Sequence, residues 1–188
     1  MNCSICSSEN LTKFLDLGTH PPPLNFVTKE EFDIKDQRFP LQVFFCNSCV
    51  LVQSGPVVDP NLMFIDYVYS SGISVSFKEH LKSLAKHIVN RFEITSNDLV
   101  IDIACNDGTL LSFFSDYGSK ILGVDPSSVA KEAKENGIPI INDFFNETVA
   151  RDILSSNGKA KAITATNVFA HVNELESFMN GIKLILSD

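Results

Sequence analysis

Two pairs of cysteines constrain this 188-residue chain more than any other feature. Cys3 and Cys6 form one C-x-x-C pair, Cys46 and Cys49 form the second, and 39 residues, from 7 to 45, separate the pairs. Two intervening residues let both thiolates of one turn reach the same ion, so two such turns complete a tetrahedral shell. We therefore predict a structural zinc site with four cysteine ligands and no open position for a substrate.

Two other readings of the cysteines are possible on spacing alone. If the four cysteines were unligated structural residues, the C-x-x-C spacing would serve no purpose in packing. A redox pair is expected at a strand-to-helix junction, and neither pair lies at one. The fifth residue, Cys105, leaves an odd number, so the five cysteines cannot all form internal disulfides. Metal binding in a reducing compartment is favoured, and we expect a cytoplasmic protein.

The charge balance argues against two classes of partner. The chain has 15 basic and 23 acidic residues, a net charge of −8. Binding to phosphate backbones needs lysine and arginine to displace counterions, so we expect no nucleic-acid partner. No run approaches the 18 or so apolar residues of a membrane span, and the N-terminus lacks the basic and apolar regions of a signal peptide. We expect no membrane partner.

The hydrophobic pattern divides the chain into three predicted parts. Residues 1–55 contain short alternating stretches typical of strands, which predicts a small zinc-ribbon-like β domain. Residues 56–93 form a connecting helical segment, because apolar residues recur at helical spacing from 81 to 89. Residues 94–188 alternate between buried strands and amphipathic helices, as βα units do.

The third part predicts a partial doubly wound, Rossmann-like sheet of the α/β class. The expected strands are 99–104, 120–124, 138–141 and 160–166, and the expected helices are 109–117, 127–136, 146–156 and 173–186. Four strands make only half of such a sheet, and an open strand edge is costly. We expect a missing C-terminal half, or another copy of the chain in a homo-oligomer, to cover that edge.

Acidic residues at two strand ends point to a nucleoside site. The loop after the first strand holds Gly108 where a dinucleotide fingerprint needs three glycines, which disfavours a pyrophosphate. Asp125 closes the second strand, where a carboxylate accepts hydrogen bonds from ribose hydroxyls. Asp102, Asn106 and Asp107 would face the cationic sulfonium and ammonium groups of a ligand. This combination favours S-adenosylmethionine over NAD.

Further residues are expected near the same edge of the sheet. Cys105 would pack or line the loop as a small polarizable residue. Asp143, Phe144 and Phe145 follow the third strand and could contact the edge of an adenine and stack on its face, although two adjacent phenylalanines are equally ordinary in a core. Asn167 and His171 lie beyond the fourth strand. A lone histidine is usually structural, but His171 is where a substrate would meet the methyl group.

Several segments together resemble one family, the sugar C-methyltransferases that act on nucleotide-activated deoxysugars. These enzymes carry a zinc-binding domain before a class I methyltransferase domain. The matching segments are the Cys3/Cys6 pair, Leu17-Gly18 with Pro21 and Asn25-Phe26, Cys46-x-x-Cys49 with Leu51-Val52-Gln53, Tyr67-Val68-Tyr69-Ser70-Ser71, Asn106-Asp107-Gly108-Thr109-Leu110, Gly123-Val124-Asp125-Pro126-Ser127 and Asn167-x-x-Ala170-His171-Val172.

The resemblance implies a reaction and a set of site residues. A carbon next to the ketone of a nucleotide-activated keto-sugar loses a proton, and the resulting enolate attacks the sulfonium methyl. Tyr67 and His171 would be catalytic, although aromatic packing is the other reading of the tyrosines. Residues that would bind S-adenosylmethionine are Tyr69, Ser71, Asp102, Cys105, Asn106, Asp107, Gly108, Asp125, Pro126, Asp143, Phe144 and Asn167.

The chain departs from the family in two respects. It has Asp102-Ile103-Ala104 where family members commonly carry Glu-x-Gly. The family also continues into a second half with a histidine-glutamate pair, so we expect this chain to be an N-terminal part. The alternative function is a non-catalytic zinc- and nucleoside-binding scaffold or pseudo-enzyme module.

Overall fold

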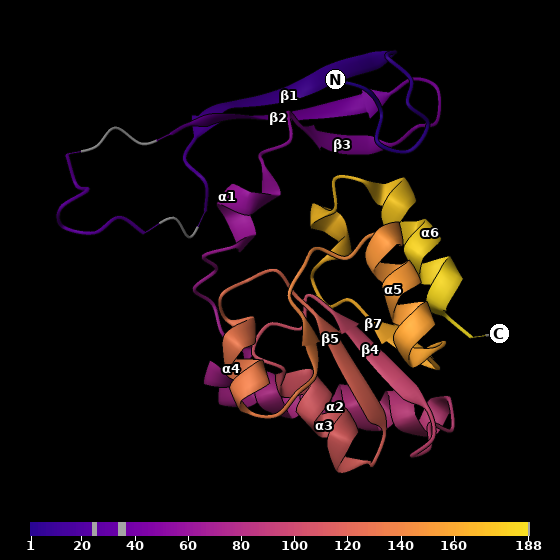
Figure 1. Ribbon diagram of the computed structural model, residues 1–188. Coiled ribbons are helices and arrows are strands. Elements are labelled where there is room, and N and C mark those ends of the chain that lie inside the picture. Colours follow the sequence, from indigo (N-terminus) through magenta and orange to yellow (C-terminus); the bar gives the residue numbers. More distant parts are fainter. Residues whose placement is uncertain (24–25, 34–36, 188) are drawn as a thin grey trace. The chain divides into compact units, whose positions relative to one another are not determined.

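The computed structural model describes residues 1–23, 26–33 and 37–187. Asn25 of the family-like segments and Asp188 lie outside the described residues. The chain folds as two compact units, Met1–Tyr67 and Val68–Asp188 (Figure 1). The predicted division into 1–55, 56–93 and 94–188 stays a prediction beside this arrangement.

The N-terminal unit contains a small antiparallel sheet. Strand β1 (Leu11–His20) pairs with β2 (Phe39–Cys46), which pairs with β3 (Val52–Gly55). The register sets Leu11 opposite Cys46, so the turn that follows β2 lies beside the start of β1. This register brings the two C-x-x-C turns together. A short helix, α1 (Pro60–Phe64), follows, with the Asp59 side chain accepting a hydrogen bond from the Asn61 backbone.

A four-stranded parallel sheet forms the centre of the second unit. Its strands are β4 (Leu99–Ile103), β5 (Lys120–Val124), β6 (Ile140–Ile141) and β7 (Ala162–Thr164), in the order β6-β5-β4-β7. All five residues of β4 are buried, as expected of an interior strand covered on both faces. Together with the cysteine-bearing antiparallel sheet, this arrangement confirms the predicted fold class.

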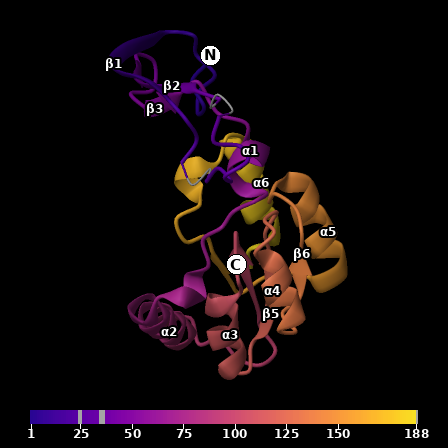
Figure 2. The ribbon, with the colours of Figure 1, turned by 90° about the vertical axis from the view of Figure 1, so that its left-hand side faces the viewer.

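Helices cover both faces of this sheet. They are α2 (Val75–Arg91), α3 (Thr109–Asp116), α4 (Ala130–Glu135), α5 (Glu147–Asn157) and α6 (Leu175–Ile185), with 3-10 turns η1 (Ser71–Ile73) and η2 (Phe169–His171). Because side chains alternate along a strand, Ile101 packs among residues of α5 and α6, whereas Val100 packs among residues of α2 and α3. Figures 1 and 2 show α2 beside α3, with α5 and α6 away from them.

Two predicted strands are shorter in the structure. The strand expected over 138–141 is reduced to Ile140–Ile141, and Ile138 joins an apolar cluster with Ala133 instead. The strand expected over 160–166 is Ala162–Thr164. Both elements lie at sheet edges, where a strand has a ladder partner on only one side.

The outer edge of β7 carries a short additional pairing. The Ala160 backbone nitrogen donates to the Ile185 carbonyl at 2.7 Å, and the Ser187 nitrogen donates to the Ala160 carbonyl at 2.9 Å. Ala160 and Leu186 thus form a parallel bridge. Ala160 precedes β7, and the expectation that a C-terminal half or a second copy of the chain covers the open edge stays a prediction.

Candidate functional site

The four paired cysteines converge on one point in the N-terminal unit. Their sulfur atoms all lie within 4.8 Å of one another. The Sγ atoms of Cys3 and Cys49 are 3.5 Å apart, and those of Cys6 and Cys46 are 3.6 Å apart. Four sulfurs at about 2.3 Å from one zinc ion would be separated by about 3.8 Å, so the cluster has the dimensions of a tetrahedral site. The residues present therefore fit zinc.

The electrostatics of the cluster also favour a bound cation. The backbone amide of Cys6 faces the Cys3 thiol and lowers its pKa to about 6. At Cys49 the backbone amide of Leu51 acts in the same direction, but the neighbouring thiols of Cys3 and Cys6 outweigh it and raise the pKa to about 12. Adjacent thiolates repel one another unless a positive charge lies between them. A divalent ion supplies that charge, and four protein ligands make its role structural.

The loop after β4 and the end of β5 are joined at the carboxyl edge of the parallel sheet. The Asn106 backbone nitrogen donates to Asp125 Oδ2 at 2.8 Å. The Ser127 backbone nitrogen donates to Asp125 Oδ1 at 2.7 Å. Each carboxylate oxygen has two lone pairs, so Asp125 can still accept hydrogen bonds from a ligand. In open α/β sheets this edge is where ligands bind.

The loop after β6 is tied to the same place. The side-chain amide of Asn142 donates to the Asp125 backbone carbonyl at 2.7 Å. Asp143 is exposed, Phe144 is half-buried, and Phe145 is buried against Phe178 in an edge-to-face pair with ring centroids 5.2 Å apart. Of the two adjacent phenylalanines, Phe145 is a core residue. Phe144 and Asp143 remain predicted adenine contacts.

The loop after β4 adopts an unusual backbone. Ala104 has a φ of 54° and Asn106 has a φ of 55°, both in the left-handed region that glycine adopts most easily. Gly108, with a φ of 76°, directly precedes α3. An alternation of left-handed residues turns the chain sharply out of the sheet and into the helix. The departure of this chain from Glu-x-Gly therefore falls on a strained position, Ala104.

Asp102 is deeply buried within β4. It is 4% exposed, and the hydroxyl of Thr164 on β7 donates to its Oδ1 at 2.6 Å. Burial raises the pKa of Asp102 to about 7. The negative charge of Asp125 also raises this pKa, whereas the hydrogen bond from Thr164 lowers it. The structure thus places this carboxyl inside the sheet, and the predicted contact of Asp102 with a cationic ligand stays a prediction.

Asn106 and Asp107 hold a segment that precedes α2. Asn106 Oδ1 accepts from the Ser71 backbone nitrogen, and its Nδ2 donates to the Tyr69 carbonyl, both at 2.8 Å. Asp107 Oδ2 accepts from the Gly72 backbone nitrogen at 2.6 Å and from the Ser70 hydroxyl. Burial alone would raise the pKa of Asp107, but its hydrogen bonds from Ser70, Thr109 and Gly72 outweigh burial and lower it.

Cys105 lies beneath the loop rather than at the rim. It is 4% exposed and packs with Leu111, Ala133 and Ile140. Burial raises the pKa of its thiol, so it is a neutral core residue at physiological pH. Of the two roles expected for Cys105, the structure supports packing, and its assignment to donor binding stays a prediction.

The remaining predicted residues are distributed over both units. Asn167 has a φ of 58° and, like His171 in η2, follows β7. Pro126 is half-buried directly after Asp125. Tyr67 belongs to the first unit, whereas Tyr69 and His171 belong to the second. The two predicted catalytic residues, Tyr67 and His171, therefore lie in different units. Their predicted roles are not tested by the geometry.

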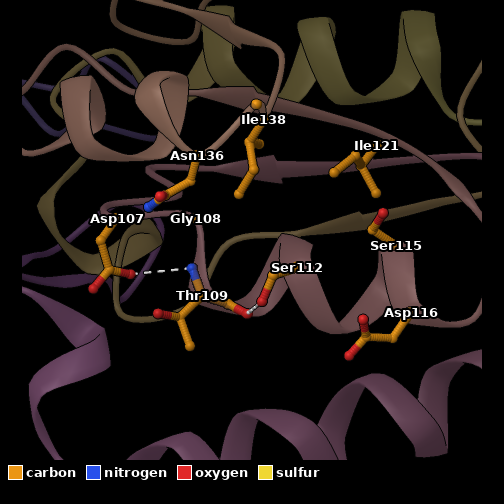
Figure 3. A pocket seen from close by; sticks show the side chains of 10 residues that line it. Asp107, Gly108, Thr109, Ser112, Ser115, Asp116, Ile121, Asn136 and Ile138 are labelled. Atoms are coloured by element: carbon orange, nitrogen blue, oxygen red, sulfur yellow. Dashed lines mark hydrogen bonds between the residues drawn. The ribbon is translucent and has the colours of Figure 1, made fainter.

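A hollow of about 330 Å³ lies beside α3, and Figure 3 shows the side chains that line it. Its lining includes Asp107, Gly108 and Asp116, together with Asn136 and Ile138 from the segment between α4 and β6. One oxygen of the Asp107 carboxylate is directed at the Thr109 backbone nitrogen, 3.0 Å away. Only Asp107 and Gly108 among the predicted site residues line this hollow.

Sequence reasoning did not identify three residues that support the site. Thr164 is the hydrogen-bond partner of Asp102, and Ser70 and Gly72 are partners of Asp107. A buried acid in an apolar strand signals that a partner exists but not which one. No sequence signal connected residues 70 and 72 with residue 107, because they meet only through the tertiary fold.

A cysteine-rich metal cluster and a Rossmann-like parallel sheet define the class of this protein, and comparisons with known proteins agree. A family profile described as a zinc binding domain matches residues 3–64. A profile described as a methyltransferase domain matches residues 77–188, more than half of the chain. The chain belongs to this methyltransferase family.

The individual relatives share only modest sequence identity with this chain. The C-methyltransferase NovU of Streptomyces niveus is 27% identical over 186 residues, which are 98% of this chain and 44% of that protein. The chain thus spans less than half the length of this curated relative. Magnesium protoporphyrin IX methyltransferase of Synechocystis PCC 6803, solved with bound SAM, has 17% identity and a TM-score of 0.47, covering 60% of this chain and 56% of that one.

The plantazolicin methyltransferase BamL, solved with SAH and a triazolic desmethylPZN analog, has 20% identity and a TM-score of 0.47, covering 61% of this chain and 44% of that one. In the described part of the chain, no helix is long and apolar enough to cross a membrane.

Proposed function

We propose that this chain is the donor-binding part of an S-adenosylmethionine-dependent C-methyltransferase that acts on a nucleotide-activated keto-deoxysugar. One observation carries the proposal. The hydrogen bond from the Asn106 backbone to Asp125 joins the loop after β4 to the acid that ends β5, at the ligand-binding edge of a parallel sheet. Membership of the methyltransferase family and the name of the relative NovU support it.

Different residues of this edge would bind different parts of the donor. Asp125 would accept hydrogen bonds from the ribose hydroxyls through its remaining lone pairs. Phe144 would stack against the adenine, and the exposed Asp143 would accept a hydrogen bond at its edge. The turn through Ala104 and Asn106 would hold the amino-acid end. When bound, S-adenosylmethionine supplies an electrophilic methyl group on a sulfonium.

The sugar half of the reaction would need residues other than those that bind the donor. Tyr67 and His171 are the proposed catalytic residues, assigned to the carbon that loses its proton and to the developing enolate oxygen. Tyr69 and Ser71 would line the donor. The zinc cluster of Cys3, Cys6, Cys46 and Cys49 would hold the N-terminal unit together and take no part in proton transfer.

Calorimetric titration with S-adenosylhomocysteine tests the donor site. The unmodified chain is expected to bind, and Asp125→Asn to weaken binding by more than about tenfold, because charge-assisted hydrogen bonds to the ribose are lost. The matched control, Asp152→Asn, changes an exposed acid on α5 and leaves affinity unchanged. If Asp125→Asn and the unmodified chain bind S-adenosylhomocysteine with equal affinity, Asp125 does not bind the ribose.

A nucleoside-binding scaffold is the second candidate. It is favoured by one observation, that the side chains of Asn106 and Asp107 are engaged in hydrogen bonds within the protein. Transfer of a labelled methyl group from S-adenosylmethionine to a keto-deoxysugar nucleotide separates the two. Transfer of the label by this chain would refute the scaffold, whereas binding of S-adenosylhomocysteine is expected of both candidates.

A further inference from the structure

The segment Tyr69–Gly72, called the latch segment below, lies in a part of the chain that neither family profile covers. The profiles match 3–64 and 77–188, so residues 65–76 fall between them. The latch segment nevertheless belongs to the second compact unit, which begins at Val68. Its last two residues, Ser71 and Gly72, belong to η1, and α2 begins at Val75. Its backbone therefore has a defined place on the methyltransferase domain, and the contacts that hold it there can be named.

Two adjacent side chains of the loop after β4 hold the latch segment. Asn106 uses both ends of its amide, accepting from the Ser71 nitrogen and donating to the Tyr69 carbonyl, at 2.8 Å each. Asp107 accepts from the Gly72 nitrogen at 2.6 Å and from the Ser70 hydroxyl. These four hydrogen bonds engage each residue of the segment. Three of them involve its backbone, so they depend on the path of the chain more than on its side chains.

The packing at Gly72 indicates how closely the two parts approach. A Cβ atom added at this residue would lie 2.9 Å from both Asp107 Oδ2 and Thr109 Oγ1. Such distances are shorter than ordinary van der Waals contact, so any larger residue must displace the carboxylate or the hydroxyl. Glycine at position 72 thus lets the segment approach Asp107 and Thr109 this closely.

The same loop residues connect the latch segment to the proposed donor site. Asn106 holds the segment through its side chain and Asp125 through its backbone nitrogen, at 2.8 Å. Its left-handed backbone, with a φ of 55°, directs the nitrogen toward β5 and the side chain toward the segment. A displacement of Asn106 would therefore disturb its hydrogen bonds with both Asp125 and Ser71.

We propose that Asn106 and Asp107 are positioning residues, which fasten the latch segment to the loop after β4 so that donor binding and ordering of Tyr69 and Ser71 are coupled. This inference rests on the proposed function for its donor, but the fastening itself does not. The side chains of Asn106 and Asp107 act on the donor through the latch segment. Coupling is reciprocal, so a donor that binds better to the fastened segment must also fasten it more firmly.

Hydrogen exchange of the full zinc-loaded chain tests the fastening. Asn106→Gly removes both side-chain hydrogen bonds, while glycine accepts the left-handed backbone without strain. We expect exchange of the Ser71 amide to rise about tenfold, with the amides of β4 and β5 unchanged. Gly72→Ala perturbs the same contact from the other side and should similarly raise exchange of the backbone amide at position 72 or of the neighbouring Ser71 amide.

A matched control uses the other left-handed residue of the loop. Ala104→Gly is the same type of substitution two residues earlier, and the methyl group that it removes cannot form hydrogen bonds, so exchange at Ser71 and Gly72 should not change. Unaltered exchange at Ser71 in both Asn106→Gly and Gly72→Ala would overturn the fastening. Faster exchange in Ala104→Gly as well would attribute the effect to the loop backbone and overturn it too.

Titration with S-adenosylhomocysteine tests the coupling. In the unmodified chain, saturating S-adenosylhomocysteine should slow exchange at Ser71 and Gly72 by about fivefold or more, and Asn106→Gly should bind it correspondingly more weakly. Asp152→Asn, at an exposed acid on α5, serves as the affinity control. Binding that leaves exchange at Ser71 and Gly72 unchanged would overturn the coupling. Absence of binding by the unmodified chain would instead refute the proposed function, and the exchange of the unliganded variants would still decide the fastening.

Discussion

The two units of this chain are stabilised in different ways. Among the described residues of Met1–Tyr67, the nearly fully buried apolar side chains are Cys3 and Cys46, both metal ligands by prediction, while Phe14 on β1 is 58% exposed. The second unit buries three apolar clusters around its sheet. A small sheet with so little core needs another source of stability, and bound metal is the usual one. The comparison therefore assigns metal to one unit and packing to the other.

Removal of the metal should have the largest effect. Cys46→Ala deletes a ligand at the end of β2, and structural zinc contributes about 10–16 kcal/mol in comparable small domains. We expect loss of zinc, and protease cleavage throughout 1–67, with the second unit still folded. Zinc analysis and limited proteolysis check this, with Cys105→Ala as the control that keeps its zinc. A zinc-free chain whose N-terminal unit resists protease would break the comparison.

Truncation of the packed core should come next. Phe114 on α3 is fully buried, and replacing a buried phenylalanine by alanine costs about 3–5 kcal/mol. Phe114→Ala should lower the unfolding free energy of the second unit by that amount and leave zinc content unchanged. Denaturant unfolding measures it, and Phe92→Ala, at a side chain that is 48% exposed, is the control with a much smaller loss. Equal losses in both variants would contradict the proposed packing.

The buried acid of β4 predicts a pH dependence for the second unit. Burial raises the pKa of Asp102 from its ordinary value of 3.8 to about 7, so the folded protein retains a proton that the unfolded chain releases. The contribution of Asp102 to stability is then greatest below pH 4 and falls as the pH rises from about 4 to about 7. Thermal unfolding across this range measures it.

Asp102→Asn should remove that pH dependence, because the amide does not titrate. The control is Asp152→Asn on the surface of α5, which should retain the wild-type profile. If Asp102→Asn and the unmodified chain lose stability in parallel between pH 4 and pH 7, another group is responsible.

A helix cap should give the smallest effect. The Asn146 side chain accepts a hydrogen bond from the Val149 backbone nitrogen at 3.0 Å and begins α5. Asn146→Ala should destabilise the second unit by about 1 kcal/mol, whereas Asn146→Asp keeps the acceptor and should have little effect. Denaturant midpoints resolve the difference. A loss in the N-terminal unit instead would show that the units do not unfold independently.

The two units also differ in how far the sequence predicted them. The strand Lys120–Val124 was predicted at its observed bounds, and the cysteine spacing predicted the cluster, because each signal is local. The predicted bounds of the strands at the sheet edges were less accurate. The strand at 138–141 was predicted too long because apolar residues there face the core from a turn, and periodicity does not separate that case from a strand.

The candidate site was predicted by position more than by contact. Asp125 and the loop at Asn106 were expected near one another from the rule for parallel strands, and the structure joins them. The engagement of Asn106 and Asp107 with Tyr69–Gly72 was not foreseen, because residues more than thirty positions apart in the chain meet only after α2 packs on α3. The burial of Asp102 against Thr164 likewise depends on the strand order.

The most direct test of the central claim is a crystal structure of the chain with S-adenosylhomocysteine. We expect the ribose hydroxyls on the Asp125 carboxylate, with the amino-acid end against the turn through Ala104 and Asn106. A nucleoside bound elsewhere on the chain, or a carboxyl edge that remains closed at saturating ligand, would contradict the account.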